Sequence, residues 1–462
     1  MERVDVAIVG GGPTGSSAAH AAATGGADAL VIEKGVPRAD RDGLGPDSTD
    51  AAGILDYWVD IMGIHPDEFD EGVVQRELNR AEFRGPDESA TLTSTGIDSS
   101  YDKFGYTFQR ARFDDWLRDR AEDAGAEYRV GTSVRGVDTD LSVAPGDDGP
   151  RHTVDLADGS TVGAEFVVLA DGPQRTVTNR VLDEYLPEDA AASERLASRT
   201  ANHIAYQEYR RVPEEVFEAV NDALVFWWGV MPGETAYPWI FPNADRVCRV
   251  GLTMPIGLGI DDVDASEYAL LRADDESIPQ GGEYIRRLLE WQYGDEYDIE
   301  ADFPVVEEAG KRNGTETYPI SSTRPIDSPV GAGIAVAGGA MGTTSAFHEG
   351  GDHVAVRTGA IAGELAAEGD LAAYNRRWKE AIGNEVVRNV TMADMVAEYE
   401  PDDWNRVIGA ADAMLAAEAG DGLLSQPYRS GWESLKLMVG YRWNKRRVKK
   451  DYVGIAESEY VY

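Results

Sequence analysis

Short apolar runs separated by a segment of small residues open the chain. Val4–Val9 and Ala29–Ile32 are rich in β-branched residues, a pattern typical of buried parallel strands. Between them, Ser16–Ala23 is rich in small side chains that suit a helix packed closely against a sheet. The hydrophobic pattern therefore predicts that the chain begins with a strand–helix–strand (βαβ) unit.

Further along, the spacing of apolar positions predicts a mixture of helices and strands. We expect helices over Ala51–Met62 and Phe113–Ala124, and strands over Tyr128–Val137, Thr153–Leu156 and Thr161–Ala170.

The middle of the chain is dense in aromatic residues. Several strand-like runs between His203 and Met254 predict an antiparallel sheet that forms a second domain. Gly333–Gly338 again has the pattern of a short buried strand, and it leads into a glycine-rich stretch and a predicted helix. The remainder, to about Lys450, is predicted to be mostly helical.

Composition supports a globular protein with an unusual charge. The 462 residues are 42% hydrophobic, and the length is sufficient for two packed cores. Acidic residues number 83 against 43 basic ones, which gives a formal net charge of −40. Such a charge destabilises a compact state through self-repulsion unless salt screens it. Because the acids occur along the whole chain and not in one block, we predict a salt-adapted protein that does not bind nucleic acid.

The single cysteine and the absence of long apolar runs bear on location. Cys248 has no partner for an internal disulfide, and we expect it to be a small core residue. The N-terminus shows no signal-peptide pattern, and no run approaches the ~20 apolar residues of a membrane span. These features predict a cytoplasmic protein, at most peripheral to a membrane.

The first candidate site is the glycine-rich turn of the βαβ unit. Gly10, Gly12 and Gly15 form a G-x-G-x-x-G pattern in which the first glycine permits a tight turn and the second admits a pyrophosphate. The third glycine lets the helix pack closely, and the helix N-terminus attracts phosphates. Glu33 ends the second strand at about the ~20-residue spacing expected of an acid that binds a ribose diol. The turn predicts a dinucleotide, either NAD or FAD.

Three later segments resemble one group of flavoproteins, which includes aromatic hydroxylases and geranylgeranyl reductases. Val167–Gly172 is similar to the group's strand followed by Asp-Gly, and Gly333–Gly359 resembles its final flavin-binding strand–loop–helix. Gln109–Asp114 is similar to the segment whose arginine, here Arg110, lies against FAD in that group. The resemblance implies FAD as the cofactor. The predicted cofactor-binding residues are Gly10, Gly12, Pro13, Thr14, Gly15, Glu33, Lys34, Arg110, Asp171, Gly172, Gly338, Gly342, Gly350 and Gly351.

The same resemblance implies an α/β fold with a divided cofactor domain. We expect residues 1–185 and 316–385 to form a Rossmann-like FAD-binding domain. Residues 186–315 would form an α+β substrate domain on an antiparallel sheet, and residues 386–462 a helical C-terminal region.

The second predicted domain carries a narrower resemblance. Tyr237, Trp239 and Phe241 stand in a Tyr-x-Trp-x-Phe-Pro element similar to that of geranylgeranyl reductases. On a strand the three aromatic side chains point to one face, so we predict a wall for a long apolar substrate.

Two positions depart from the group's pattern. Gly339 stands where the group usually has an Asp that contacts the cofactor, and Gly351–Gly359 also resembles electron-transfer flavoprotein:quinone oxidoreductases, which lack that Asp too. The loop after the second strand lacks the cysteine that several geranylgeranyl reductases carry there, which leaves the substrate open.

The resemblance places His348 and Glu349 near the flavin, and these two are the predicted catalytic residues, either as proton donors or as polar contacts. We predict no metal ligands. A basic stretch, Arg442–Lys450, contains six basic residues; we expect it to pair with the acidic body, with anionic lipid headgroups as the alternative.

Together these features predict an FAD-dependent oxidoreductase that reduces isoprenoid double bonds of a polyprenyl lipid or quinone. Its electrons would come from a ferredoxin-like protein, an electron-transfer flavoprotein or NAD(P)H. The alternatives are a quinone-linked dehydrogenase that works with a separate ferredoxin-like subunit, a flavin monooxygenase or halogenase, and a lipid carrier that has lost its flavin. A single cysteine cannot supply the four thiolates of an iron–sulfur centre, so the first alternative requires that extra subunit.

Overall fold

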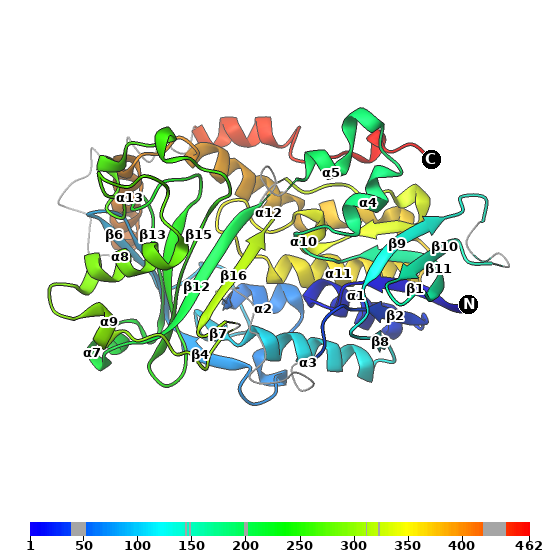
Figure 1. The fold of residues 1–462 in the computed structure, drawn as a ribbon, viewed down its shortest axis with the longest axis horizontal. Helices are drawn as coiled ribbons and strands as arrows, with labels where there is room; N and C mark the ends of the chain where they lie inside the picture. The colour runs from blue at the N-terminus through cyan, green and yellow to red at the C-terminus, as the bar shows by residue number, and fades with distance from the viewer. Residues whose placement is uncertain are drawn as a thin grey trace.

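Three β-sheets and the helices around them make up the fold of this computed structural model (Figure 1). The structure describes residues 1–37, 52–143, 146, 149–197, 202–310, 312–321, 324–418 and 440–462. Two sheets have seven strands each and the third has three. In Figure 1 the two large sheets lie side by side along the long axis of the molecule.

The first large sheet has the order β8-β2-β1-β11-β10-β9, and β17 also pairs with β11. Its strands are β1 (Glu2–Val9), β2 (Ala29–Ile32), β8 (Glu127–Arg129), β9 (Val134–Thr139), β10 (His152–Leu156), β11 (Thr161–Leu169) and β17 (Ile334–Val336). Strands β8, β2, β1, β11 and β17 pair in parallel, whereas β9, β10 and β11 form antiparallel pairs. Their apolar side chains form one continuous core, as expected for a parallel sheet covered on both faces.

Two helices pack against this sheet with almost no space between their backbones. α1 (Pro13–Thr24) and α11 (Asp352–Ala367) cross where α11 carries glycines. A Cβ atom on Gly359 would lie 2.1 Å from the Thr14 carbonyl oxygen, and one on Gly363 would lie 2.0 Å from that of Ala18. Only glycine permits this close approach. The contact brings the start of α1 against a segment more than 300 residues later in the chain.

The second large sheet is mostly antiparallel, with the order β16-β12-β15-β14-β13-β5-β6. Its strands are β5 (Arg80–Arg84), β6 (Ser89–Leu92), β12 (His203–Arg211), β13 (Ala223–Trp227), β14 (Tyr237–Pro242), β15 (Val247–Pro255) and β16 (Thr315–Ile320). The pairing of β13 with β5 is parallel. One face packs on α8 (Gly281–Tyr293) and α7 (Glu214–Val220), and the other face carries an aromatic cluster.

The small sheet and the remaining helices connect these layers. The small sheet contains β3 (Gly53–Leu55), β7 (Gly105–Phe108) and β4 (Val74–Leu78) in that order. The remaining helices are α2 (Asp56–Met62), α3 (Arg110–Asp123), α4 (Thr178–Asp183), α5 (Ala192–Arg195), α9 (Ile299–Asp302), α10 (Gly338–Met341), α12 (Tyr374–Val396) and α13 (Pro401–Glu418). Residues 440–448 are also helical.

The predicted α/β fold class and the helical C-terminal region are confirmed. Two local predictions were wrong. The single strand expected over Tyr128–Val137 is two strands, β8 and β9, because the chain leaves the sheet edge between them. The helix expected over Ala51–Met62 begins only at Asp56, because Gly53–Leu55 pairs with β7; Ala51 lies outside the described residues.

The domain boundaries stay a prediction, but the sheets show which segments pack together. β5 and β6, within the first predicted segment, are strands of the aromatic sheet, and β16 forms its opposite edge. Among the described helices, none combines the length and the apolar character that crossing a bilayer requires.

Candidate active site

A single cavity of about 1190 Å³ joins the parallel sheet to the aromatic sheet. It is lined by the turn after β1, the end of β2, the loop after β11, the N-terminus of α11 and one face of the aromatic sheet. Of the predicted site residues, all line this cavity except Gly15, Gly338 and Gly342, which lie just behind its wall. Segments that are far apart in sequence therefore meet at one site.

The glycine turn has the geometry that a bound pyrophosphate requires. Gly10 has φ 101°, and a Cβ atom on Gly15 would lie 1.8 Å from the Gly10 carbonyl oxygen, so both positions require glycine. A Cβ atom on Gly12, in contrast, would meet no atom within 4 Å, because this residue faces the cavity. No side chain caps the N-terminus of α1, which begins at Pro13 with Thr14 next. An anion in the cavity would meet this helix end directly.

Glu33 and Lys34 lie at the end of β2, beside this turn. The Glu33 carboxylate accepts hydrogen bonds from the backbone N–H groups of Gly11 and Gly35, each at 2.6 Å. These bonds fix the carboxylate at the cavity wall and leave it further acceptor capacity for a ribose diol. Its role as the ribose ligand stays a prediction.

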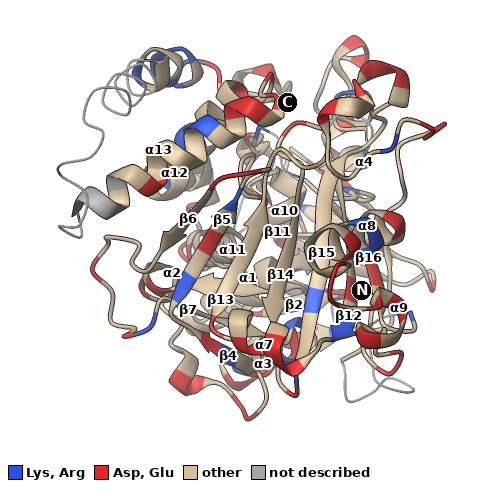
Figure 2. Cartoon of the chain, turned by 90° about the vertical axis from the view of Figure 1, so that its left-hand side faces the viewer, with Lys and Arg blue, Asp and Glu red and all other residues tan. Residues whose placement is uncertain are grey.

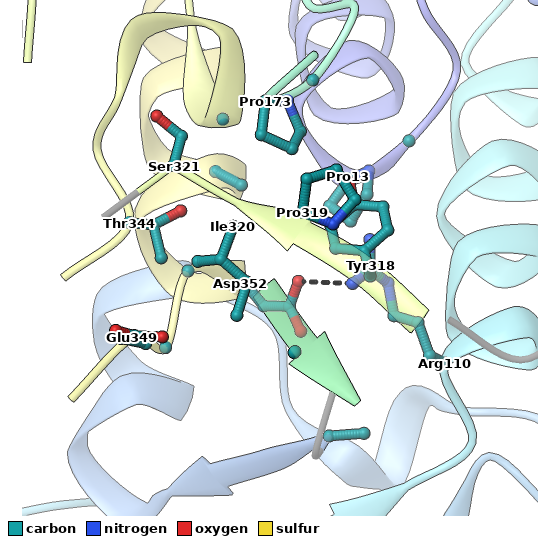
Figure 3. A pocket seen from close by; sticks show the side chains of 18 of the residues that line it. Pro13, Arg110, Pro173, Tyr318, Pro319, Ile320, Ser321, Thr344, Glu349 and Asp352 are labelled. Atoms are coloured by element: carbon teal, nitrogen blue, oxygen red, sulfur yellow. Dashed lines mark ion pairs between the residues drawn. The ribbon is translucent and has the colours of Figure 1, made fainter. Parts of the chain in front are cut away.

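Arg110 is the first residue of α3 and points across the cavity toward α11 (Figure 3). Its guanidinium forms ion pairs with Asp352 at 3.0 Å and with Asp114 at 2.7 Å. The side chains of Arg110 and Asp352 are only 14% and 10% exposed, so the pair is well shielded from solvent. Tyr318, which the sequence did not single out, also lines the cavity, and its hydroxyl would lie 3.7 Å from a Cβ atom on Gly172.

Asp171 and Gly172 form the turn after β11. The Asp171 carboxylate accepts hydrogen bonds from the backbone N–H groups of Val177 and Thr178, at 2.7 and 3.1 Å, at the start of α4. Asp171 therefore holds its loop in place at the cavity, and Gly172 adopts φ 78°. Gly339 also lines the cavity, so at this position backbone atoms take the place of a side-chain acid.

The remaining predicted glycines shape the segment from β17 to α11. Gly338 and Gly342 have positive φ angles of 60° and 85° at the two ends of the short helix α10. Gly350 and Gly351 precede α11 and line the cavity. Their roles as cofactor ligands stay predictions.

The predicted aromatic wall forms part of the cavity lining. Tyr237, Trp239 and Phe241 of β14 all line the cavity, whereas Ile240 between them packs into the core on the opposite face of the sheet. Phe226 contacts two of them, with ring centroids 5.7 Å from Tyr237 and 5.3 Å from Phe241. This half of the cavity therefore offers a continuous apolar and aromatic lining.

His348 is half-buried at the cavity wall, and its imidazole is neutral. Burial, reinforced by the neighbouring His353, lowers its pKa to about 3. Its Nδ1 atom accepts a hydrogen bond from the backbone N–H of Gly350 at 3.2 Å, and its ring lies 5.7 Å from that of Trp58. A neutral imidazole that accepts a hydrogen bond is poorly suited to donate a proton.

Glu349 lies in a cluster of polar side chains that the sequence did not indicate. Its carboxylate pairs with His203 and accepts hydrogen bonds from the hydroxyls of Thr253 and, at 3.2 Å, Thr235. His203 and Glu349 are 146 positions apart, so no local pattern in the sequence could have joined them. Burial lowers the pKa of His203, but the Glu349 carboxylate outweighs burial, and the net pKa is raised.

Cys248 is fully buried on β15, as expected for a core residue. Burial raises the pKa of its thiol to about 12, so the thiol does not contribute to the site.

The geometry of the cavity fits FAD. It combines open space at Gly12, an uncapped helix N-terminus and an arginine shielded from solvent. A family described as FAD binding domain matches residues 3–211. The chain therefore carries an FAD-binding domain, and the protein is an FAD-dependent oxidoreductase.

The chain is also similar over most of its length to lipid reductases. The chain is 26% identical to the digeranylgeranylglycerophospholipid reductase of Methanothrix thermoacetophila, over 88% of this chain and 90% of the relative. It is 28% identical to the enzyme of the same name from Methanocaldococcus jannaschii, over 81% of this chain and 82% of the relative.

Solved structures show the same fold. A geranylgeranyl bacteriochlorophyll reductase-like protein from Thermoplasma acidophilum superposes with a TM-score of 0.67 at 20% identity, covering 97% of this chain and 99% of that one. The myxobacterial chondrochloren halogenase CndH superposes with a TM-score of 0.54 at 19% identity, covering 92% of each chain. At these identities the likeness establishes the fold alone.

Proposed function

We propose that this protein reduces isoprenoid carbon–carbon double bonds of a polyprenyl lipid or quinone. The observation that carries the proposal is the continuity of the cavity, which is lined at one end by the glycine turn and at the other by aromatic residues of β14. The digeranylgeranylglycerophospholipid reductases to which the chain is similar over most of its length support this choice of substrate.

The apolar half of the cavity suits a prenyl chain. Burial of such a chain contributes about 0.8 kcal/mol for each methylene removed from water, without any need for polar contacts. Phe83, Phe226 and Trp228 extend the lining beyond β14 and stack on one another with ring centroids 5.6 to 6.0 Å apart. A flat aromatic lining of this kind also accommodates the bends of a polyprenyl chain.

The chemistry gives the aromatic lining a second role. Reduction of an isolated alkene adds a hydride to one carbon and a proton to the other, and reduced FAD supplies the hydride when bound. Positive charge develops at the more substituted carbon, where aromatic faces stabilise it. Tyr237, Trp239 and Phe241 are each at most 5% exposed, so they also exclude water from the reacting bond.

A second part of the proposal concerns the membrane. Tyr441 lines the cavity and belongs to helical residues 440–448, which carry exposed Arg442, Trp443 and Arg446. Trp443 is 66% exposed. Arg447 pairs with Asp394 at 3.6 Å, whereas neither Arg442 nor Arg446 forms an ion pair with the described residues. An exposed tryptophan flanked by cations is suited to a bilayer surface with anionic headgroups. We propose that this helix docks the cavity mouth on such a surface.

The net charge supports a further proposal about the environment. Because acidic side chains exceed basic ones by 40, we propose that the protein works at high salt, where this charge is screened.

A separate electron carrier is also part of the proposal, since the sequence contains one G-x-G-x-x-G turn and that turn belongs to the FAD-binding domain.

The experiment that tests the proposed function is anaerobic reoxidation of the reduced flavoprotein. Protein purified in molar KCl with FAD is reduced with dithionite and mixed with a geranylgeranyl lipid. Return of the oxidised-flavin absorbance, with a product two mass units heavier per reduced bond, is expected. A flavin that stays reduced with every prenyl compound but is reoxidised by a short-chain quinone would favour the quinone-linked dehydrogenase instead.

A further inference from the structure

Glu349 combines a strained backbone with a buried carboxylate that needs partners. Its φ angle is 54°, in the left-handed region that residues with a side chain rarely adopt. Its side chain is 2% exposed, and a buried carboxylate costs several kcal/mol unless it is paired and hydrogen-bonded. Strained backbone of this kind is concentrated at functional sites. The surrounding structure holds this carboxylate at the cavity wall against both costs.

The partners of Glu349 come from the aromatic sheet. His203 begins β12, Thr253 belongs to β15, and Thr235 precedes β14. The neighbouring Tyr237 hydroxyl donates a hydrogen bond to the His348 carbonyl oxygen at 2.6 Å. Glu349 itself lies in the loop that leads to α11. The cluster therefore joins the cofactor half of the molecule to the substrate half.

This junction is where alkene reduction needs a proton. Glu349 lines the same cavity as Gly351 and Asp352 on one side and Tyr237 and Trp239 on the other (Figure 3 shows Glu349 and Asp352 at this wall). A carbon–carbon double bond held between the two halves would lie beside the carboxyl group. His348 is not an imidazolium that could act as the acid, because burial lowers its pKa to about 3.

We propose that Glu349 and His203 form the proton-donating pair of this enzyme, an inference that rests on the proposed function. The proton that the pair holds on the His203 imidazolium passes through the Glu349 carboxylate to the alkene carbon that does not receive the hydride. The alkene gains two electrons with the hydride, and one proton is consumed per bond reduced. Glu349 is left as a carboxylate, and the neutral His203 imidazole then takes up a new proton from solvent. Glu349 is then the catalytic acid and His203 the positioning residue that supplies it.

The charges around the pair favour a stored proton. The Glu349 carboxylate and, more weakly, Glu234 raise the pKa of His203 against the effect of burial. Among the described residues, the hydroxyls of Thr235 and Thr253 also face the pair, and both are neutral. The His203 side chain is 14% exposed, which leaves a route for exchange with water. The pair therefore keeps its proton to a higher pH than an isolated histidine would, and it loses the proton as the pH rises through the raised pKa of His203.

Substitution of each residue tests the pair. Glu349→Gln keeps the size and the hydrogen-bonding groups but removes the acid, and we expect the rate of prenyl-dependent flavin reoxidation to fall about 100-fold or more. His203→Gln should lower this rate by a smaller factor and abolish the loss of rate on the alkaline side of the wild-type pH profile. Glu208→Gln is the matched control, because Glu208 is a buried, paired carboxylate on β12 that does not line the cavity. It should retain the wild-type rate and profile.

A second measurement does not depend on turnover. The imidazole of His203, followed by ¹⁵N NMR in the protein without substrate, should titrate at lower pH in Glu349→Gln than in the wild type, because the carboxylate that raises its pKa is gone. An unchanged titration of His203 would overturn the proposal that the pair donates the proton. A Glu349→Gln protein that turns over as fast as the wild type would overturn it too. A wild-type protein that reduces no prenyl compound would instead overturn the proposed function, and the pair with it.

Discussion

At the scale of single residues, two glycines of one turn have opposite physical roles. Gly12 faces open cavity, whereas Gly15 packs against the backbone of Gly10. A methyl group on the first would intrude on a bound pyrophosphate without touching the protein. A methyl group on the second would force the turn and helix α1 apart. The same substitution should therefore affect cofactor affinity at one position and stability at the other.

We expect Gly12→Ala to weaken FAD binding by about 10-fold or more while changing the free energy of unfolding by less than about 0.5 kcal/mol. Gly15→Ala should lower the free energy of unfolding by about 1–3 kcal/mol, as overpacking does in general. Calorimetric titration of the cofactor-free protein with FAD, together with urea unfolding, measures both effects. Equal FAD affinity in Gly12→Ala and the wild type would show that the pyrophosphate does not approach this residue.

The sequence predicts residues whose chemistry is local and misses those whose chemistry depends on folding. Gly10, Gly12 and Gly15 are recognisable because strand, turn and helix follow one another directly in the chain. The pairing of His203 with Glu349 arises only when the aromatic sheet meets the loop before α11. The low pKa of His348 likewise follows from burial, which a sequence does not display.

At the scale of elements, strands with strong periodicity were predictable and their partners were not. β1, β2, β10 and β11 lie close to where the apolar pattern placed them. The parallel pairing of β5 with β13 was not foreseen, because these strands are far apart in sequence and β5 lies within the predicted cofactor segment. The aromatic sheet is therefore completed by a segment whose neighbours in sequence belong to the other half of the molecule.

The helical segment over residues 440–448 carries a prediction of its own. The double variant Arg442→Glu and Arg446→Glu should bind vesicles of phosphatidylglycerol at low salt at least about 10-fold more weakly than the wild type, since each basic residue contributes ~1 kcal/mol. Trp443→Ser should weaken binding even where salt screens the charges. Arg211→Glu, an exposed arginine on β12, is the control and should bind as the wild type does. Cosedimentation measures all four proteins, and equal binding by the double variant would rule out this docking helix.

At the scale of the whole molecule, charge is distributed and not local. Figure 2 shows Asp and Glu on helices and loops over the whole face in view, with fewer basic residues between them. Many of the arginines that are present form ion pairs, among them Arg287 with Asp275 and Glu283. Pairing of this kind cannot neutralise a formal charge of −40, so most acidic side chains repel one another across the surface.

This repulsion makes stability depend on salt in a direction that can be measured. The Debye length falls from about 30 Å at 0.01 M to about 3 Å at 1 M, so added KCl removes repulsion between distant carboxylates while short ion pairs persist. Because the unfolded chain spreads the same charges further apart, screening stabilises the folded state more than the unfolded one. The midpoint of thermal unfolding, recorded with excess FAD, should therefore rise continuously as KCl increases over this range.

Sucrose, which carries no charge, serves as the control for general effects of solute exclusion. At the concentrations that match the water activity of each KCl solution, it should raise the midpoint less than KCl does. A midpoint that stays flat in KCl, or that rises equally in sucrose, would show that the acidic surface does not limit folding.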